Sequence, residues 1–356
     1  MKQLITILFI FAYCLLPTAY CLAQDPQFSQ FYAAPLYLNP AFAGAASQSR
    51  VIPNYRNQWP SIPGSYVTYS GSFDHNLDIY NSGVGILFTT DKSGSGSLVS
   101  TDINLLYSYK IYLSKEIIFK PGLQFGYTFR DINYNELRFS SSFENDGSTG
   151  SYINQYAEAT KVNYADISTG FLLYSKHFWL GAAAHHLNTP NQSLLKAESA
   201  LPIKTSFHAG ANIPIKNTNR PSTISPVILY KAQGKFDQLD VGGYFHYDPV
   251  MFGVVWYRGL PFKHYKKGYA NHDAIILLLG FKYEHFIMGY SYDITISQLA
   301  PSTGGSHELS LSYEFDPRRD KTRRPKRKDH IIPCPDFYNI KKAEKKWKYY
   351  NSIQYK

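Results

Sequence analysis

The feature that most constrains this chain is an alternation of apolar and polar residues, which recurs from about residue 50 to residue 315. In 122–131, Leu123, Phe125 and Tyr127 fall on one face, and Gln124 and Thr128 fall on the other. Segment 306–315 alternates in the same way. Successive side chains of a β-strand point to opposite faces, so the pattern predicts strands with one apolar and one polar face.

We expect fourteen such strands, most of them about ten residues long, which exceeds the usual five or six residues of a globular sheet. Tyr or Phe stands near the ends of many of them, as in the aromatic girdles of transmembrane barrels. The pattern predicts an all-β fold, a transmembrane antiparallel up-and-down β-barrel, although the strands of a soluble β-sandwich also alternate. The expected strands lie near 50–59, 65–75, 81–91, 98–110, 116–131, 164–175, 177–187, 203–213, 223–233, 238–247, 250–259, 272–283, 286–296 and 306–315.

Composition excludes several other classes. Aromatic residues make up 16% of the chain and charged residues 17%, whereas a disordered chain is poor in aromatic residues and rich in charge. The net charge of +10 is concentrated in 316–356, which holds 14 basic and 5 acidic residues. Since the rest of the chain is close to neutral, the basic balance does not indicate a nucleic-acid partner.

The N-terminus has the pattern of a secretory signal peptide, which we place at 1–23. Lys2 precedes an apolar stretch over 4–16, and Cys21 and Ala23 are small residues at positions −3 and −1 of a cleavage site. The mature chain would keep one cysteine, Cys334, so an intramolecular disulfide is excluded. No later apolar run approaches the roughly 20 residues of a membrane helix, so an exported chain of this kind is either soluble or a closed barrel.

Three further segments follow the signal peptide. Residues 24–49 are rich in proline and aromatic residues, and we expect them to pack inside the barrel or against its periplasmic rim. Residues 50–315 form the predicted outer-membrane barrel, and 316–356 a basic periplasmic tail. An even number of strands would place both termini on the periplasmic side.

A series of short strings, in a fixed order, carries a family resemblance. The chain resembles the PorP/SprF family of type IX secretion system membrane proteins of the Bacteroidetes. The strings are Gln24 to Tyr32, Pro35 to Gly44, Tyr55 to Trp59, Asp91-Lys92, His185 to Asn188, Pro190 to Ser193, Trp256 to Arg258, Gly289 to Asp293 and Ser306 to Leu309.

The resemblance implies an outer-membrane β-barrel that works with the type IX export machinery. Members of that family support the secretion and cell-surface attachment of partner proteins, which include large adhesins, some of which serve gliding motility. The implied partners are type IX secretion components and an exported surface protein, besides outer-membrane lipid.

Four residues of the barrel region are candidates for partner binding. If Tyr55 and Trp59 face lipid, Arg56 and Gln58 face the lumen, where Arg56 would bind an acidic partner or a barrel carboxylate. His185 precedes a second histidine, but neighbours on a strand point to opposite faces and do not readily share a metal ion. Asn191 lies in a predicted loop over 188–193 that could fold into the barrel mouth.

The tail supplies the remaining candidates. A dense run of basic residues is followed by a short stretch with helical potential, and its candidates are Arg323, Arg324, Lys326, Arg327, Lys328 and Trp347. Three interpretations are open: the tail binds an acidic periplasmic protein or peptidoglycan, it is retained by lipid charge, or it is a solvated extension.

Catalytic motifs are absent from the sequence: there is no G-x-S-x-G, H-E-x-x-H or P-loop, and we expect no cofactor and no catalytic or metal site. We therefore expect a protein that is not an enzyme. The alternatives are a passive porin or transporter of small hydrophobic molecules, a soluble carbohydrate-binding protein, and an enzyme with a dispersed triad.

Overall fold

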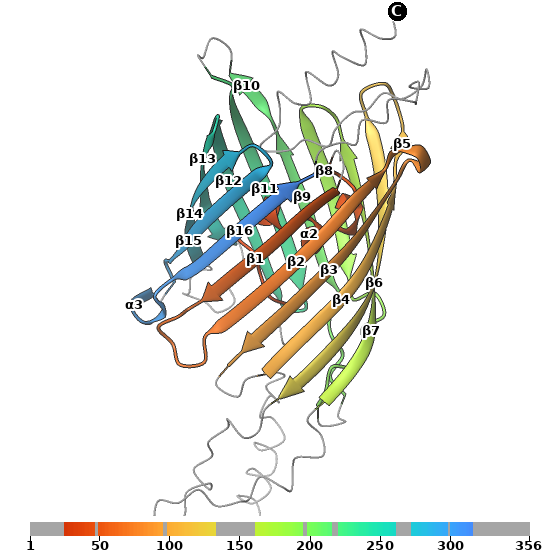
Figure 1. Ribbon diagram of the computed structural model, residues 1–356. Coiled ribbons are helices and arrows are strands. Elements are labelled where there is room, and N and C mark those ends of the chain that lie inside the picture. Colours follow the sequence, from red (N-terminus) through yellow and green to blue (C-terminus); the bar gives the residue numbers. More distant parts are fainter. Residues whose placement is uncertain are drawn as a thin grey trace, which may run out of the picture.

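The computed structural model describes residues 25–46, 49–94, 98–132, 161–194, 198–215, 220–260, 272–297 and 300–315. Most of these residues are in β-strands, and the helices are few and short (Figure 1). The strands are β1 (Ser49–Gln58), β2 (Tyr66–Leu77), β3 (Ser82–Ser93), β4 (Leu98–Tyr109), β5 (Ile111–Tyr112), β6 (Ile118–Ile132), β7 (Lys161–Tyr174), β8 (Phe178–His185), β9 (Lys204–Ala211), β10 (Ile213–Ile215), β11 (Ser222–Gln233), β12 (Phe236–Tyr247), β13 (Val250–Gly259), β14 (His272–Tyr283), β15 (Phe286–Thr295) and β16 (Ser306–Glu314).

Fourteen long strands of the described chain close into an antiparallel barrel. Each pairs with its neighbours in sequence, β1 pairs with β16, and β9 pairs with β11, so that the sheet has no open edge. The two remaining strands, β5 and β10, are short additions to β6 and β11. The predicted fold is confirmed, and each of the fourteen expected segments coincides with a long strand to within a few residues.

The outer face of the barrel carries the apolar half of the alternation. On β6, Leu123, Phe125 and Tyr127 are exposed, while Gln124 and Thr128 are buried. The long strands show the same division where both faces are described, and the exposed apolar band suits contact with lipid. No helix in the described part of the chain is long and apolar enough to cross a membrane.

The two ends of the barrel differ. At one end, where β1 begins and β16 ends, most connections are short, such as 248–249 and 284–285; we call this the turn end. At the other end the connections include 59–65, 186–203 and 260–271, and we call this the loop end.

Residues 25–46, which we call the plug, lie inside the barrel (Figure 1). They form η1 (Phe31–Ala33), α2 (Pro35–Leu38) and η2 (Pro40–Phe42), and the two prolines start α2 and η2 because a first helical residue needs no N–H donor. The barrel connections hold η3 (Asp78–Tyr80) and α3 (Ala300–Thr303).

The main hydrophobic core sits between the plug and the inner wall. Phe31, Leu38 and Ala41 of the plug pack with Leu172 and Tyr244 among the wall residues. A smaller cluster joins Leu36 and Ala43 of the plug to β3 and β4. The lumen is therefore apolar where the plug packs against it, and not polar throughout as the alternation alone predicts.

Candidate functional site

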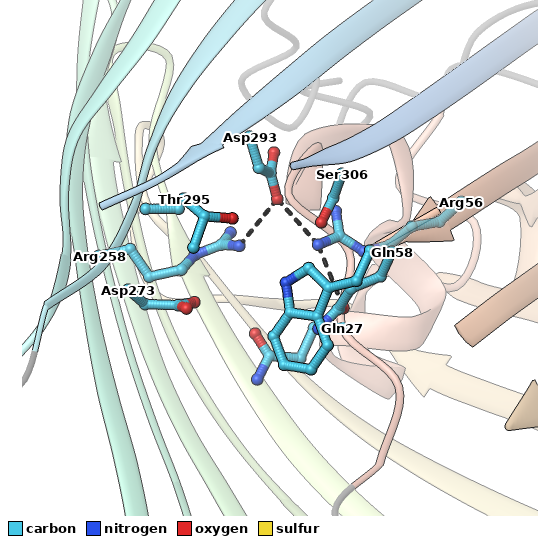
Figure 2. Close-up of a pocket in the computed structure, with 10 residues that line it drawn as sticks. Gln27, Arg56, Gln58, Arg258, Asp273, Asp293, Thr295 and Ser306 are labelled. Atoms are coloured by element: carbon cyan, nitrogen blue, oxygen red, sulfur yellow. Dashed lines mark hydrogen bonds and ion pairs between the residues drawn. The ribbon is translucent and has the colours of Figure 1, made fainter. Parts of the chain in front are cut away.

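A cluster of buried charges joins the plug to the junction of the first and last strands. We call Arg56, Arg258, Asp240, Asp293 and Glu308 the seam cluster, because β1 and β16 meet there. Arg56 donates from Nη1 to Glu308 Oε2 at 3.0 Å and from Nη2 to Asp293 Oδ2 at 2.8 Å. Arg258 donates to Asp293 Oδ2 at 3.1 Å and to Asp240 Oδ1 at 3.1 Å. Figure 2 shows the Asp293 carboxylate between the two guanidinium groups.

The plug supplies the remaining partners of this cluster. Ser29 and Gln30 donate their backbone N–H groups to the two carboxylate oxygens of Glu308, at 2.7 and 3.0 Å. The Ser29 hydroxyl donates to Asp293 and accepts from both arginines. Arg56 is 3% and Arg258 1% exposed, so these are charge-assisted hydrogen bonds between buried groups, and such bonds are stronger than neutral ones.

Two side-chain amides of the plug bond to the barrel wall. The Gln30 side chain donates to the Glu308 carbonyl and accepts from the Ser310 hydroxyl. The Asn39 side chain donates to the carbonyls of Phe171 and Ala182, at 2.9 and 3.1 Å, and accepts from its own neighbour, Ala41 N. The plug is thus fixed to strands on opposite sides of the bore.

At the loop end the plug is held by a second set of charged and polar side chains, the mouth cluster: Asp25, Asp166, His186, Lys204 and Gln233. Asp25 accepts from Lys204 Nζ at 2.5 Å and from Gln233 Nε2 at 3.1 Å, and lies 2.9 Å from His186 Nε2. His186 Nδ1 lies 3.0 Å from Asp166. Because both ring nitrogens face carboxylates, the imidazolium form of His186 fits this position.

The electrostatics of the mouth cluster follow from these contacts. Burial favours neutral Asp25, but the charges of Lys204 and His186 and the hydrogen bonds from both hold the pKa of its carboxyl well below the usual range. Burial opposes the charge on His186 as well, but the Asp25 charge and the bonds to Asp166 and Asp25 raise its pKa to about 9. Asp25 and His186 are therefore an ion pair at neutral pH.

At the turn end the barrel wall bonds to the backbone of the plug and packs closely against it. Lys120 Nζ and the Ser108 hydroxyl donate to the Ala43 carbonyl, at 2.6 and 2.7 Å. Gly122 faces the plug so closely that a Cβ there would collide with the backbone of Ala41. The plug therefore extends from the loop end, at Asp25, to the turn end, where the chain enters β1.

Two cavities border the plug. A small one of about 30 Å³ adjoins the seam cluster, and its lining includes Gln27, Gln58 and Thr295 (Figure 2). A larger one of about 420 Å³ opens at the loop end, between the plug and the inner face of β11 to β14. No group of three or more His, Cys, Asp or Glu side chains within the described ranges could hold a metal ion.

The candidate residues of the barrel region have different surroundings. Arg56 belongs to the seam cluster, and Gln58 accepts from Arg56 Nη2 at 3.4 Å and lines both cavities. His185 is buried at the end of β8, with Nε2 3.4 Å from the plug carbonyl of Leu38. Asn191 shapes its own loop, because its Oδ1 accepts from the backbone of Ser193 and Ser199. The tail candidates Arg323, Arg324, Lys326, Arg327, Lys328 and Trp347 lie outside the described residues.

Two side chains differ from simple strand alternation. Trp59 follows β1 with φ of +58° and lines both cavities, although its spacing from Tyr55 placed it on the lipid face. His186 follows β8 with φ of +61° and reaches Asp25 at the mouth. Alternation fails at both residues because a left-handed residue turns the chain out of its pleat.

Sequence reasoning did not single out the other members of the seam cluster. Asp293, Arg258 and Glu308 are each the single charged residue in one of the strings on which the family resemblance rests, whereas Asp240 lies outside those strings. Ser29 and Gln30 lie in the first of those strings. A single charged residue within each string was the available signal.

One family model matches most of the chain. A family model described as "Type IX secretion system membrane protein PorP/SprF" matches residues 21–313. No curated protein matches the chain.

Solved barrels are similar at low identity. Omp33 of Acinetobacter baumannii has 7% identity and a TM-score of 0.43, covering 76% of this chain and 100% of its own. The toluene transporter TodX of P. putida has 10% identity and a TM-score of 0.45, covering 79% and 94%. Because the family model spans most of the chain, this protein belongs to the PorP/SprF family of type IX secretion system membrane proteins.

Proposed function

We propose that this protein is a non-enzymatic outer-membrane barrel that binds partner proteins of type IX secretion, and that it is not a passive pore. It supports the secretion or surface attachment of exported proteins such as adhesins, in some cases for gliding motility. Its partners are type IX secretion components and an exported surface protein. The family is a secretion-system family rather than an enzyme family, which supports the proposal that the protein is not an enzyme.

The fold supports a location in the outer membrane. A closed barrel with an apolar outer band satisfies its backbone within lipid, and single-chain barrels of this kind belong to bacterial outer membranes. In such barrels the short turns face the periplasm and the long loops face outwards. The turn end of this protein is accordingly assigned to the periplasm.

The observation that carries the proposal is the occupied bore. The plug is bonded to the seam cluster, to β7 and β8 through Asn39, and to the mouth cluster through Asp25. A barrel filled in this way has its own segment where a porin has its channel. This supports a role in binding, through the loop end or the tail, over passage of small molecules through the lumen.

Planar bilayer recording tests the closed bore. The wild-type protein is expected to show no steady conductance, and a variant lacking residues 25–44 is expected to conduct. Wild-type conductance equal to that of the deletion variant would favour the porin alternative. Heat-modifiable migration in gel electrophoresis would verify that both proteins are folded.

Partner binding is tested in the host. Purification in mild detergent is expected to recover type IX secretion components or an exported surface protein together with the barrel. Removal of the gene is expected to deplete specific proteins from the cell surface. An unchanged surface proteome and unchanged spreading behaviour would contradict the proposal.

A further inference from the structure

The larger cavity, at the loop end, has the dimensions of a small-molecule site. Its volume of about 420 Å³ lies in the range of about 300 to 1,000 Å³ that ligand pockets occupy. Phe28 and Phe31 of the plug form one side, and Leu229 and Phe236 of the barrel wall lie on the other. Ligand sites are usually lined in this way, mainly by apolar side chains with a few polar groups.

Most of the charged groups that line this cavity are already engaged. Asp25 is paired with Lys204, and Asp237 accepts from the Tyr230 hydroxyl at 3.4 Å. Lys231 and Asp273 differ: within the described part of the chain neither side chain makes a hydrogen bond or an ion pair, although the opposite charges of Asp240 and Arg258 act on Lys231 and Asp273, respectively. Figure 2 shows the Asp273 carboxylate near Arg258 but outside the drawn contacts.

The spacing of these two groups sets the length of a complementary ligand. Lys231 is on β11 and Asp273 on β14, with β12 and β13 between them. Three strand spacings separate their backbones by about 14 Å along the wall, and the inward side chains shorten the gap between the charges. An extended peptide advances about 3.3–3.6 Å per residue, so two or three residues span the remaining distance between the ammonium group of Lys231 and the carboxylate of Asp273.

We propose that this cavity binds a short apolar peptide of two or three residues whose chain ends are both free. Its carboxylate pairs with Lys231, its ammonium group pairs with Asp273, and its side chains lie against Phe28, Phe31 and Leu229. Such a ligand bonds to both charged groups at once, whereas a ligand with one charge leaves the other group without a direct hydrogen bond. The site does not depend on the role of the barrel in secretion.

The test uses the full-length protein in detergent and the dipeptide Leu-Phe as the probe in calorimetry. N-acetylation removes the ammonium charge and C-terminal amidation removes the carboxylate. Each capped form is expected to bind the wild-type protein about tenfold more weakly, as expected for the loss of one hydrogen bond between charged groups.

Two substitutions assign the ends of the ligand. Lys231→Met is expected to abolish the preference for the free carboxylate over the amide, and Asp273→Asn the preference for the free amine over the acetyl form. Lys231→Arg, which keeps the charge, should retain the first preference, and Lys161→Met on the exposed part of β7 should alter neither.

Three results would overturn the inference: no measurable binding of Leu-Phe, equal binding of all three forms, or preferences that survive both substitutions. Because bilayer conductance and the surface proteome are measured separately, failure here is distinguishable from failure of the proposed function. Heat-modifiability again identifies any variant that does not fold, and Lys231→Arg then carries the test.

Discussion

At the scale of single residues, Arg56 joins several buried groups of the seam cluster and the plug. Its guanidinium group bonds to Glu308, Asp293 and the Ser29 hydroxyl, and each of those groups is buried. Its removal leaves two carboxylates near each other without their main counter-charge. Breaking a buried pair by removing one partner is far more costly than the pair is worth against an apolar replacement.

We therefore predict that Arg56→Ala destabilises the barrel by about 3–5 kcal/mol. Urea unfolding in detergent, followed by tryptophan fluorescence, measures the change in unfolding free energy. The matched control is Lys161→Ala, because Lys161 pairs with Asp131 at 3.5 Å on an exposed surface and its loss should cost less than about 1 kcal/mol. Equal effects of the two substitutions would contradict the prediction.

The mouth cluster predicts a dependence on pH. His186 has a folded-state pKa of about 9 against about 6.5 for a free histidine, so its stabilising contribution is complete below about pH 6.5 and is lost as the pH rises through about 9. The lowered pKa of Asp25 acts in the opposite direction, and its contribution is lost only in strong acid.

The thermal unfolding midpoint is thus expected to fall between pH 6.5 and 10 in the wild-type protein, and to fall less in His186→Gln. The difference between the two pH profiles isolates His186 from the other groups that titrate in that range. Parallel profiles would mean that His186 is not charged at the mouth.

At the scale of elements, the plug and the strands it touches fit together through close backbone contacts. Gly122 on β6 lies against Ala41, and Gly83 on β3 lies against Ala43. Neither glycine has room for a side chain. The turn-end half of the plug is consequently held by close packing and by the bonds of Lys120 and Ser108 to the Ala43 carbonyl, whereas its loop-end half is held mainly by ion pairs.

Gly122→Ala is predicted to force the plug away from β6 and to destabilise the barrel by about 1–3 kcal/mol, the range for overpacked interiors. Gly71→Ala on β2 is the control, since a Cβ there meets nothing within 4 Å. Limited proteolysis within residues 25–46, combined with the unfolding midpoint, measures both effects. If Gly122→Ala resists proteolysis and unfolding as well as Gly71→Ala does, the steric argument is wrong.

The strands could be predicted from the sequence because the period of two repeats over ten residues or more, as in Leu123, Phe125 and Tyr127. The helices of the plug could not, because three or four residues are too short to show a helical period. Arg56 was predicted to face the lumen and, in one interpretation, to bind a barrel carboxylate. Its partners Asp293 and Glu308 lie 237 and 252 residues away, and one sequence holds no signal for contacts at that separation.

At the scale of the whole molecule, the path of the plug separates the two ends of the described chain. Asp25 is at the loop end, with Lys204 and Gln233, while Phe315 follows β16 at the turn end. An even strand count places only the ends of β1 and β16 on the same side, because the plug crosses the bore before β1.

We predict that an epitope inserted just before Asp25 is labelled by antibody on intact cells, and that one placed after Phe315 is labelled only in permeabilised cells. The reason is that long loops face outwards in barrels of this class. The two tagged proteins serve as controls for each other. Labelling of both epitopes from the same side would exclude a plug that crosses the bore.

The contacts of Ser29 and Gln30 also have a consequence for biogenesis. Their backbone N–H groups bond to Glu308, some 280 residues later in the chain, on the strand that completes the ring. These hydrogen bonds can form only after the last hairpin, β15 and β16, has been made and has reached the barrel. We therefore expect pairing of β16 with β1 and packing of the plug in the bore to occur together, as one cooperative step of barrel closure.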